Sequence, residues 1–302
     1  MFRFDTLLAM DTVCSRPAHA KINLHLAVGL PYPDGYHPIQ SLFALVGLSD
    51  TITLRWKESE TFDVQVQGLE AYCSPTDNTL TKAARLWHEA GGSTLHLEIK
   101  CDKQIPVKAG LGGGSSDAAS LLAMLQAIDS KHALPAQVLH SVALQVGSDV
   151  PFFLYGYSAA LVTGKGENVA PLDSRPMSAL LVMPTFFDVS TSSAYRMLDE
   201  MRANQENVHI PGIQELLQIY EKPSHKWRGL LYNDFQSCSS NGAFYTTLET
   251  VAKEYEGFFG MSGSGACWFF VSEDASQVHD VHANVVAAFG PRVRCWITHL
   301  MS

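Results

Sequence analysis

The chain has 302 residues, of which 46% are hydrophobic and 17% are charged, and its formal net charge at pH 7 is −9. This length allows one large domain or two medium ones, each with its own core. The negative balance argues against a nucleic-acid partner, which requires a basic face, and the absence of an apolar run of about 18 residues argues against a transmembrane helix.

The start of the chain and the cysteines together indicate a cytoplasmic protein. Residues 1–13 carry Arg3, Asp5 and Asp11, a pattern that fits neither a signal peptide nor a transit peptide. The six cysteines and twelve histidines are scattered, without the spacing of a disulfide framework or a zinc site. We therefore expect free thiols in a reducing compartment, no protein-bound transition metal and no membrane contact.

The first half of the chain predicts strands and helices in alternation. Residues 20–27 alternate between apolar and polar side chains, as in a half-buried strand, and residues 31–37 form a turn centred on Asp34-Gly35. Pro135 predicts the start of a helix that ends at Gly147 and buries residues 138, 139, 142 and 146. Further strands are expected over 51–56, 62–66, 95–100 and 158–162, and further helices over 78–90, capped by Asp77 or Asn78, and over 115–128.

A cluster of Pro171, Asp173, Ser174 and Pro176 marks a candidate domain boundary. It divides the chain into residues 1–173 and residues 174–302. The second half predicts strands over 178–183, 266–271 and 292–297 and helices over 192–202, 213–220 and 241–255. Both halves therefore read as α+β.

The strongest functional signal is the glycine-rich segment 110–116, Gly-Leu-Gly-Gly-Gly-Ser-Ser, which leads directly into a predicted helix. Glycines allow backbone N–H groups to approach an anion closely, and a helix N-terminus favours phosphate. The alternative is a flexible turn with a serine cap. The segment lacks the Gly-Lys-Ser/Thr ending of a Walker A loop, the Rossmann pattern is weak, and the protein-kinase signatures are absent. A kinase with this loop therefore has another fold.

Three weaker signals accompany the loop. Asp149, in Gly-Ser-Asp-Val-Pro, is either a helix cap or a carboxylate that handles a hydroxyl proton in phosphoryl transfer. Lys21, with Asn23 on the same strand face, is either solvated or the partner of such a carboxylate. Gly263 and Gly265 form either a tight loop before a buried strand or a second close backbone approach.

Together these motifs resemble the GHMP kinase superfamily of small-molecule kinases, and within it the members that phosphorylate an alcohol carrying cytidine diphosphate. The resemblance extends over nearly the whole chain, with the motifs in the family's order. It implies a ribosomal-S5-like N-terminal domain and a ferredoxin-like C-terminal domain, with the site between them. The matching segments are 17–24 (Pro-Ala-His-Ala-Lys-Ile-Asn-Leu), 34–37 (Asp-Gly-Tyr-His), the glycine loop with Asp117, 147–151, 233–235 (Asn-Asp-Phe) and 262–267 (Ser-Gly-Ser-Gly-Ala-Cys).

The resemblance also implies a role for each matching position. Lys21 and Asp149 would be the catalytic pair, and Asn23 would help to position the substrate. Magnesium would arrive with ATP, with few protein ligands. The implied partners are small molecules, and the protein would be a monomer or a homodimer. The ATP phosphates would be held by Pro106, Gly110, Leu111, Gly112, Gly113, Gly114, Ser115 and Ser116, the nucleoside of ATP by Asn78 and Lys103, and the cytosine by Tyr36, His37 and Tyr195.

Two alternatives stay open. Another GHMP kinase, of the homoserine or mevalonate type, would not need the Tyr36-His37 pair. A non-catalytic sensor of a nucleotide or sugar would not need both Lys21 and Asp149. The first motif departs from the family's Pro-Ala-Lys, and we treat His19-Ala20 as a local insertion that leaves Lys21 and Asn23 in register.

Overall fold

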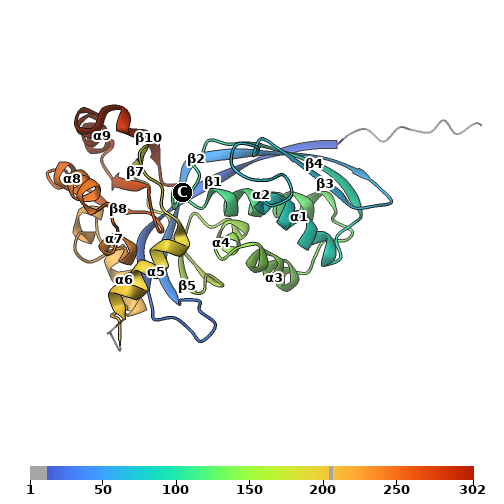
Figure 1. Ribbon diagram of the computed structural model, residues 1–302, viewed down its shortest axis with the longest axis horizontal. Helices are drawn as coiled ribbons and strands as arrows, with labels where there is room; N and C mark the ends of the chain where they lie inside the picture. The colour runs from blue at the N-terminus through green and yellow to red at the C-terminus, as the bar shows by residue number, and fades with distance from the viewer. Residues whose placement is uncertain (1–11, 204–206) are drawn as a thin grey trace, which may run out of the picture.

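The computed structural model describes residues 12–203 and 207–302 and contains two β-sheets with helices packed against them (Figure 1). Most of the N-terminal segment discussed above lies outside the described residues. The first sheet has the order β3-β4-β2-β5-β6, and β1 pairs with β2 along its length. Its elements are β1 (Thr12–Val28), β2 (Ile39–Glu58), β3 (Asp63–Gln67), α1 (Thr79–Glu89), β4 (Leu95–Asp102), α2 (Gly113–Ile128), α3 (Ala136–Val146), α4 (Val150–Tyr155), β5 (Ala159–Gly164) and β6 (Asn168–Leu172).

The second sheet is antiparallel, with the order β10-β7-β9-β8. The chain passes from the first sheet to the second between Leu172 and Ser178, and we propose the domain boundary there, between residues 173 and 174. The elements of this half are β7 (Ser178–Pro184), α5 (Thr191–Arg202), α6 (Ile213–Tyr220), η1 (Ser224–Trp227), α7 (Asp234–Ser237), α8 (Gly242–Ala252), β8 (Phe258–Met261), β9 (Trp268–Ser272), α9 (Ala275–Phe289), η2 (Gly290–Arg292) and β10 (Val293–His299).

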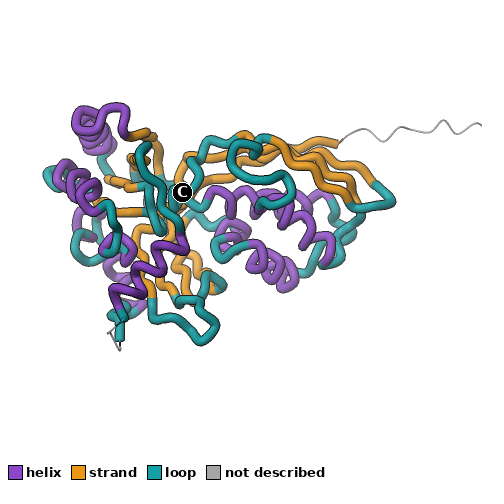
Figure 2. Tube along the Cα trace, viewed as in Figure 1, coloured by secondary structure: helices purple, strands orange, loops and turns teal. Residues whose placement is uncertain are grey.

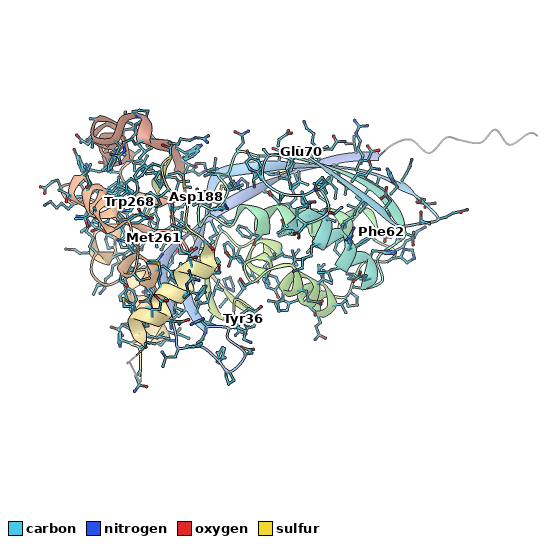
Figure 3. All side chains as sticks on the ribbon, in the orientation of Figure 1. Tyr36, Phe62, Glu70, Asp188, Met261 and Trp268 are labelled. Atoms are coloured by element: carbon cyan, nitrogen blue, oxygen red, sulfur yellow. The ribbon has the colours of Figure 1, made fainter. Side chains whose placement is uncertain are left out.

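The helices leave one face of each sheet free to meet the other domain. Helices α1 to α4 gather on one side of the first sheet, and α8 and α9 lie on the outer side of the second (Figure 2). Between the two sheets a continuous apolar cluster joins Ile22 of β1 to Leu181 of β7 and Phe269 of β9. Trp268 and Met261 lie inside the C-terminal domain, whereas Tyr36 lies in the exposed loop between β1 and β2 (Figure 3). The packed interface holds the residues that line it in a fixed arrangement.

Several predictions are confirmed by the structure. The helix capped by Asn78 begins at Thr79, where the Asn78 side chain accepts from the Thr81 backbone N–H at 2.9 Å. The turn around Asp34-Gly35 is present, and Gly35 has a φ of 83°. The predicted burial of Val138 is wrong: this residue is 37% exposed in the first turn of α3, whereas Val142 and Val146, further along the helix, are buried.

No helix in the described part of the chain combines the length and the apolar composition that a membrane crossing needs.

Candidate active site

A cleft of about 970 Å³ is lined by residues from both domains. Its walls come from β1, the loop before α2, the start of α4 and helix α5. The residues expected to form the site lie together here, with the exception of Ser116. Those that line the cleft are Lys21, Asn23, Tyr36, His37, Asn78, Lys103, Pro106, Gly110, Leu111, Gly112, Gly113, Gly114, Ser115, Asp149 and Tyr195.

The glycine loop enters α2 through backbone conformations that only glycine adopts without strain. Gly112 caps the helix with a φ of 70°, in the left-handed region. A Cβ on this residue would lie 2.8 Å from Cζ of Phe153 and 3.2 Å from Cε of Lys21. The first N–H groups of α2 have no partner within the helix, and the residues that carry them line the cleft. The loop therefore presents unpaired donors beside the Lys21 side chain.

The second glycine segment, residues 262–265, packs directly on the first. The Ser262 hydroxyl donates to the Gly110 carbonyl at 2.9 Å, and a Cβ on Gly110 would meet the Ser262 carbonyl at 2.0 Å. Asn233 holds this segment by donating to the carbonyls of Met261 and Gly263. Of the two interpretations left open for Gly263 and Gly265, the structure therefore supports a close backbone approach, here between the two domains.

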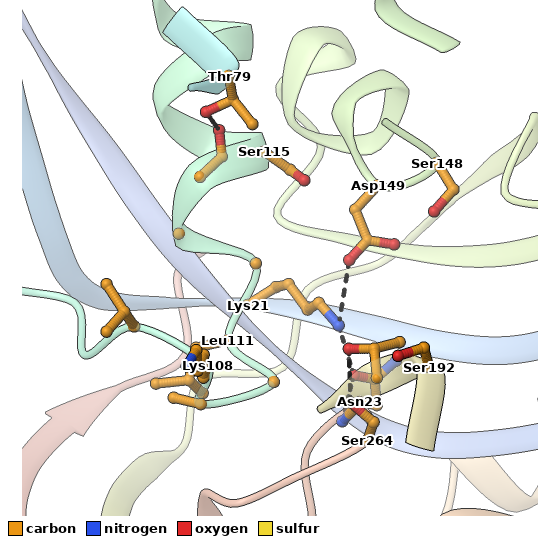
Figure 4. A pocket seen from close by; sticks show the side chains of 18 of the residues that line it. Lys21, Asn23, Thr79, Lys108, Leu111, Ser115, Ser148, Asp149, Ser192 and Ser264 are labelled. Atoms are coloured by element: carbon orange, nitrogen blue, oxygen red, sulfur yellow. Dashed lines mark hydrogen bonds and ion pairs between the residues drawn. The ribbon is translucent and has the colours of Figure 1, made fainter. Parts of the chain in front are cut away.

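Lys21 and Asp149 face each other across the cleft, as Figure 4 shows. Lys21 Nζ lies 3.4 Å from Asp149 Oδ2 and donates to Asn23 Oδ1 at 2.6 Å. The lysine is only 3% exposed, and its ammonium group lies 4.5 Å from the centre of the Phe43 ring. Asp149 occupies the cap position of α4 but makes no capping hydrogen bond with its side chain. Its carboxylate instead points at Lys21.

Asn23 connects this pair to the second domain. Besides Lys21, its side-chain oxygen accepts from the Gly263 backbone N–H at 2.8 Å, and its amide nitrogen donates to Ser41 at 2.9 Å. One amide therefore fixes the position of the lysine relative to the second glycine segment. Such a saturated arrangement holds its side chain in a single orientation.

Aromatic side chains line the other end of the cleft. His37 Nε2 lies 2.8 Å from Asp199 Oδ1, and the ring centres of His37 and Tyr195 are 4.8 Å apart. Tyr36 is 64% exposed, and Lys165 Nζ lies 4.9 Å from the centre of its ring. Burial, together with the charges of Asp149 and Asp199, raises the pKa of Tyr195 to about 12, so its phenol stays neutral. This end of the cleft can enclose a flat ring between aromatic faces.

Three of the expected ATP residues are engaged elsewhere in the structure. Ser116 is buried within α2 and does not line the cleft. The Lys103 ammonium group lies between the carboxylates of Asp50 and Asp117. Asn78 lines the cleft, but its side-chain amide donates to the carbonyls of Ser74 and Pro75 while its oxygen caps α1.

Sequence reasoning gave no role to several charged residues of the cleft, among them Lys165 and Asp199. Lys165 lies in the turn between β5 and β6 and pairs with Asp34, far away in sequence. The only local signal is its place between Gly164 and Gly166, which are both at positive φ. Asp199 follows Tyr195 by one helical turn on α5, so a helical projection places both on one face.

A magnesium ion in this cleft would take most of its oxygen ligands from phosphate and water, and the protein would supply one or two more. Among residues 12–203 and 207–302 no three His, Cys, Asp or Glu side chains gather into a metal site. Asp149 and the Ser115 hydroxyl line the cleft near the start of α2. Since Mg²⁺ in such sites keeps several waters and binds through one or two carboxylates plus phosphates, these two donors fit it.

The glycine loop at a helix start, the Lys21–Asp149 pair and the two-sheet architecture define a small-molecule kinase of the GHMP class. Residues 78–157 match the GHMP kinases N terminal domain. The structure is similar to a homoserine kinase from Cytophaga hutchinsonii, with a TM-score of 0.65 over 100% of this chain and 97% of that one, at 14% identity. At that identity the likeness concerns the fold alone.

Similarity to one branch of the class is much higher. The chain is 35% identical over 290 residues to a 4-diphosphocytidyl-2-C-methyl-D-erythritol kinase of Rhodococcus jostii, covering 92% of this chain and 91% of the relative. A kinase of the same name from Deinococcus radiodurans is 34% identical over 93% and 90% of the two chains. A solved 4-(cytidine 5'-diphospho)-2C-methyl-D-erythritol kinase superposes with a TM-score of 0.75 at 29% identity, over 96% of this chain and 100% of that one. The chain belongs to the 4-diphosphocytidyl-2-C-methyl-D-erythritol kinase family.

Proposed function

We propose that the protein transfers the γ-phosphoryl group of ATP to the 2-hydroxyl of 4-diphosphocytidyl-2-C-methyl-D-erythritol, a step of non-mevalonate isoprenoid precursor biosynthesis. The observation that carries this proposal is the placement of the Lys21–Asp149 pair in one cleft, between the glycine loop and the aromatic end. The relatives that carry this kinase's name support the choice of substrate.

The phosphoryl-transfer step follows from what each group can do. The unpaired N–H groups at the start of α2 bind the ATP phosphates, and the helix dipole adds to their attraction. The Asp149 carboxylate takes the proton of the 2-hydroxyl as its oxygen bonds to the γ-phosphorus, and ADP leaves. The Lys21 ammonium group stabilises the negative charge on the transferring group and the orientation of Asp149. Asp149 and Ser115 would add ligands to a magnesium ion that arrives with ATP, and the ion would neutralise phosphate charge.

The aromatic end supplies the recognition of the cytidyl group. The cytosine ring stacks between Tyr36 and Tyr195, and His37 hydrogen-bonds to it. Asp199, which holds His37 Nε2, orients the imidazole. Asn23 keeps Lys21 directed at the acceptor hydroxyl.

The test is an assay of ADP release by purified protein with ATP and Mg²⁺ and a panel of alcohols: the cytidyl substrate, homoserine and mevalonate. We expect turnover with the cytidyl substrate alone. Turnover with homoserine or mevalonate instead would support the other GHMP kinases. Nucleotide binding without turnover of any alcohol would support a sensor and refute the enzyme.

We further propose a cytoplasmic location and a monomer or a homodimer as the active form. The six cysteines are all free thiols, as a reducing compartment favours.

A further inference from the structure

A second group of charged side chains lies beneath the glycine loop and takes no part in the mechanism above. Asp50 comes from the middle of β2, Lys103 follows the last residue of β4, and Asp117 lies in the first turns of α2. Lys103 Nζ donates to Asp117 Oδ2 at 3.0 Å and makes a closer contact with Asp50 Oδ2. We call these three residues the acid–lysine cluster. Asp50 is 0% exposed and Asp117 is 2% exposed.

The acid–lysine cluster is attached to both ends of the glycine loop. At the entry, Asp50 Oδ1 accepts the backbone N–H groups of Gln104, at 2.5 Å, and Ile105, at 2.8 Å, the two residues before Pro106. At the exit, Asp117 lies one helical turn beyond Gly113. Lys103 Nζ bridges the two carboxylates and lies 3.0 Å from the place that a Cβ on Gly113 would occupy. Through it, the entry and the exit of the loop are joined by charged hydrogen bonds.

The charges of the cluster do not balance when both carboxylates are ionised, since two anions face one cation. The groups that face Asp117 are Lys103, Asp50 and the Cys101 thiol, whose Sγ lies 3.8 Å from Asp117 Oδ2. Asp117 Oδ1 is buried and finds no hydrogen-bond partner among the described residues. Burial, opposed by Lys103 and reinforced by Asp50, raises the pKa of Asp117 to about 7. Burial opposes the charge on Lys103, but the two carboxylates outweigh it and raise the pKa of that lysine.

We propose that Asp50 and Asp117 are positioning residues for ATP, which act through Lys103 to hold the two ends of the glycine loop in the arrangement that receives the phosphates. The inference rests on the proposed function only in requiring ATP at this loop. A buried charge left without its partner is strongly unfavourable, so removal of one carboxylate changes the position of Lys103 and with it the loop. Neither residue touches the acceptor alcohol.

The cluster also couples ATP binding to a proton. Lys103 and Asp117 both line the cleft that would hold ATP, so negative phosphates there favour the protonated form of Asp117. ATP binding then takes up a proton, so its affinity falls as the pH rises through the raised pKa of Asp117. A permanently neutral side chain at this position removes that dependence.

The experiment measures the Kd of ATP with Mg²⁺ by calorimetry between pH 6.5 and 8.5, for the full-length wild type and for Asp50→Asn, Asp117→Asn and Asp102→Asn. Binding is read without turnover, so a failure of the proposed acceptor leaves this test intact. Asp102 is the matched control, because it is a half-exposed carboxylate paired with Lys100 next to the cluster. The KM for the cytidyl substrate and the melting temperature of each variant are measured alongside.

We expect Asp50→Asn to weaken ATP binding at every pH by at least about tenfold, because it disturbs the charged hydrogen bonds that hold Lys103 and the backbone before Pro106. Asp117→Asn keeps an oxygen for Lys103 and leaves the two backbone hydrogen bonds of Asp50 in place, so it tests the pH dependence with less disturbance of the loop. Its Kd for ATP should stay level where the wild-type Kd rises, and the KM for the cytidyl substrate should be unchanged. Wild-type ATP affinity in Asp50→Asn, or parallel pH profiles for Asp117→Asn and the wild type, would overturn the proposal.

Discussion

Replacement of Gly110 by alanine tests whether the contact between the two glycine segments sets the geometry of the site. Gly110 has a φ of 74°, and a Cβ there would meet the Ser262 carbonyl oxygen at 2.0 Å. Ordinary contact begins at 3.4 Å, so the two segments would have to separate by about 1.4 Å. Because Asn23 ties Lys21 to Gly263, this separation also moves the lysine relative to Asp149.

The size of the effect follows from two separate costs. The left-handed backbone alone costs a non-glycine residue about 1–2 kcal/mol of stability. The forced separation adds about 1–3 kcal/mol, as in an overpacked core. A misplacement of about 1 Å in an active site can cost about 100-fold in rate, so we expect kcat/KM to fall by at least about that factor.

Gly156→Ala is the matched control, because Gly156 has a φ of 70° and nothing within 4 Å of an added Cβ. This substitution has the free-energy cost of a left-handed backbone conformation but no steric contact like that of Gly110→Ala with the Ser262 carbonyl. Urea unfolding and steady-state kinetics on both variants separate the two costs. We expect Gly156→Ala to lose stability alone, and Gly110→Ala to lose stability and activity. If the two variants have indistinguishable kcat/KM, the contact between the segments does not set the catalytic geometry.

Three further predictions concern the site and the core. Asp149→Asn should lower kcat by about 10²- to 10⁴-fold, as loss of a general base does, with ATP binding unchanged by calorimetry; a wild-type kcat would make Asp149 a helix cap only. Tyr36→Ala should raise the KM for the cytidyl substrate, by the factor that corresponds to about 1–3 kcal/mol of base stacking, and leave the KM for ATP unchanged; equal effects on both would contradict stacking. Burial lowers the pKa of His25 to about 4, below its unfolded value of about 6.5, so stability is fully present above about pH 6.5 and falls as the pH drops toward 4, by about 3 kcal/mol. Urea unfolding at several pH values should show this loss in the wild type and a smaller one in His25→Asn; equal losses would assign the effect to other groups.

Secondary structure could be predicted from the sequence where the hydrophobic pattern repeats over enough residues to be recognised. Residues 213–220 form a helix with the expected bounds, since an apolar face repeats over two turns. Strand β2 was predicted over 51–56 but spans Ile39–Glu58, because its first part is buried on both faces and does not alternate. The elements β6, β8 and α7 have only four or five residues, too few for a period to emerge.

The candidate site was predictable where a motif carried it and not where distant segments meet. The glycine loop, Lys21 and Asp149 stand in motifs and lie together in the cleft. The partners of His37 and Lys103 are carboxylates from other elements, and no local pattern distinguishes them from solvated surface charges. Ser116 points into the core because the helix turns its side chain about 100° from that of Ser115.

The Asn23 side chain has a consequence for inhibitor design. Its oxygen receives both the Lys21 ammonium group and the Gly263 backbone, so a compound wedged between the two glycine segments would disturb the proton-accepting pair without contacting it. Linkage makes the effect reciprocal: whatever occupies the space at Lys21 and Asp149 changes the affinity of such a wedge by the same factor. An allosteric inhibitor of this enzyme would therefore bind at the seam between its domains, and its potency would change with the concentration of the acceptor alcohol.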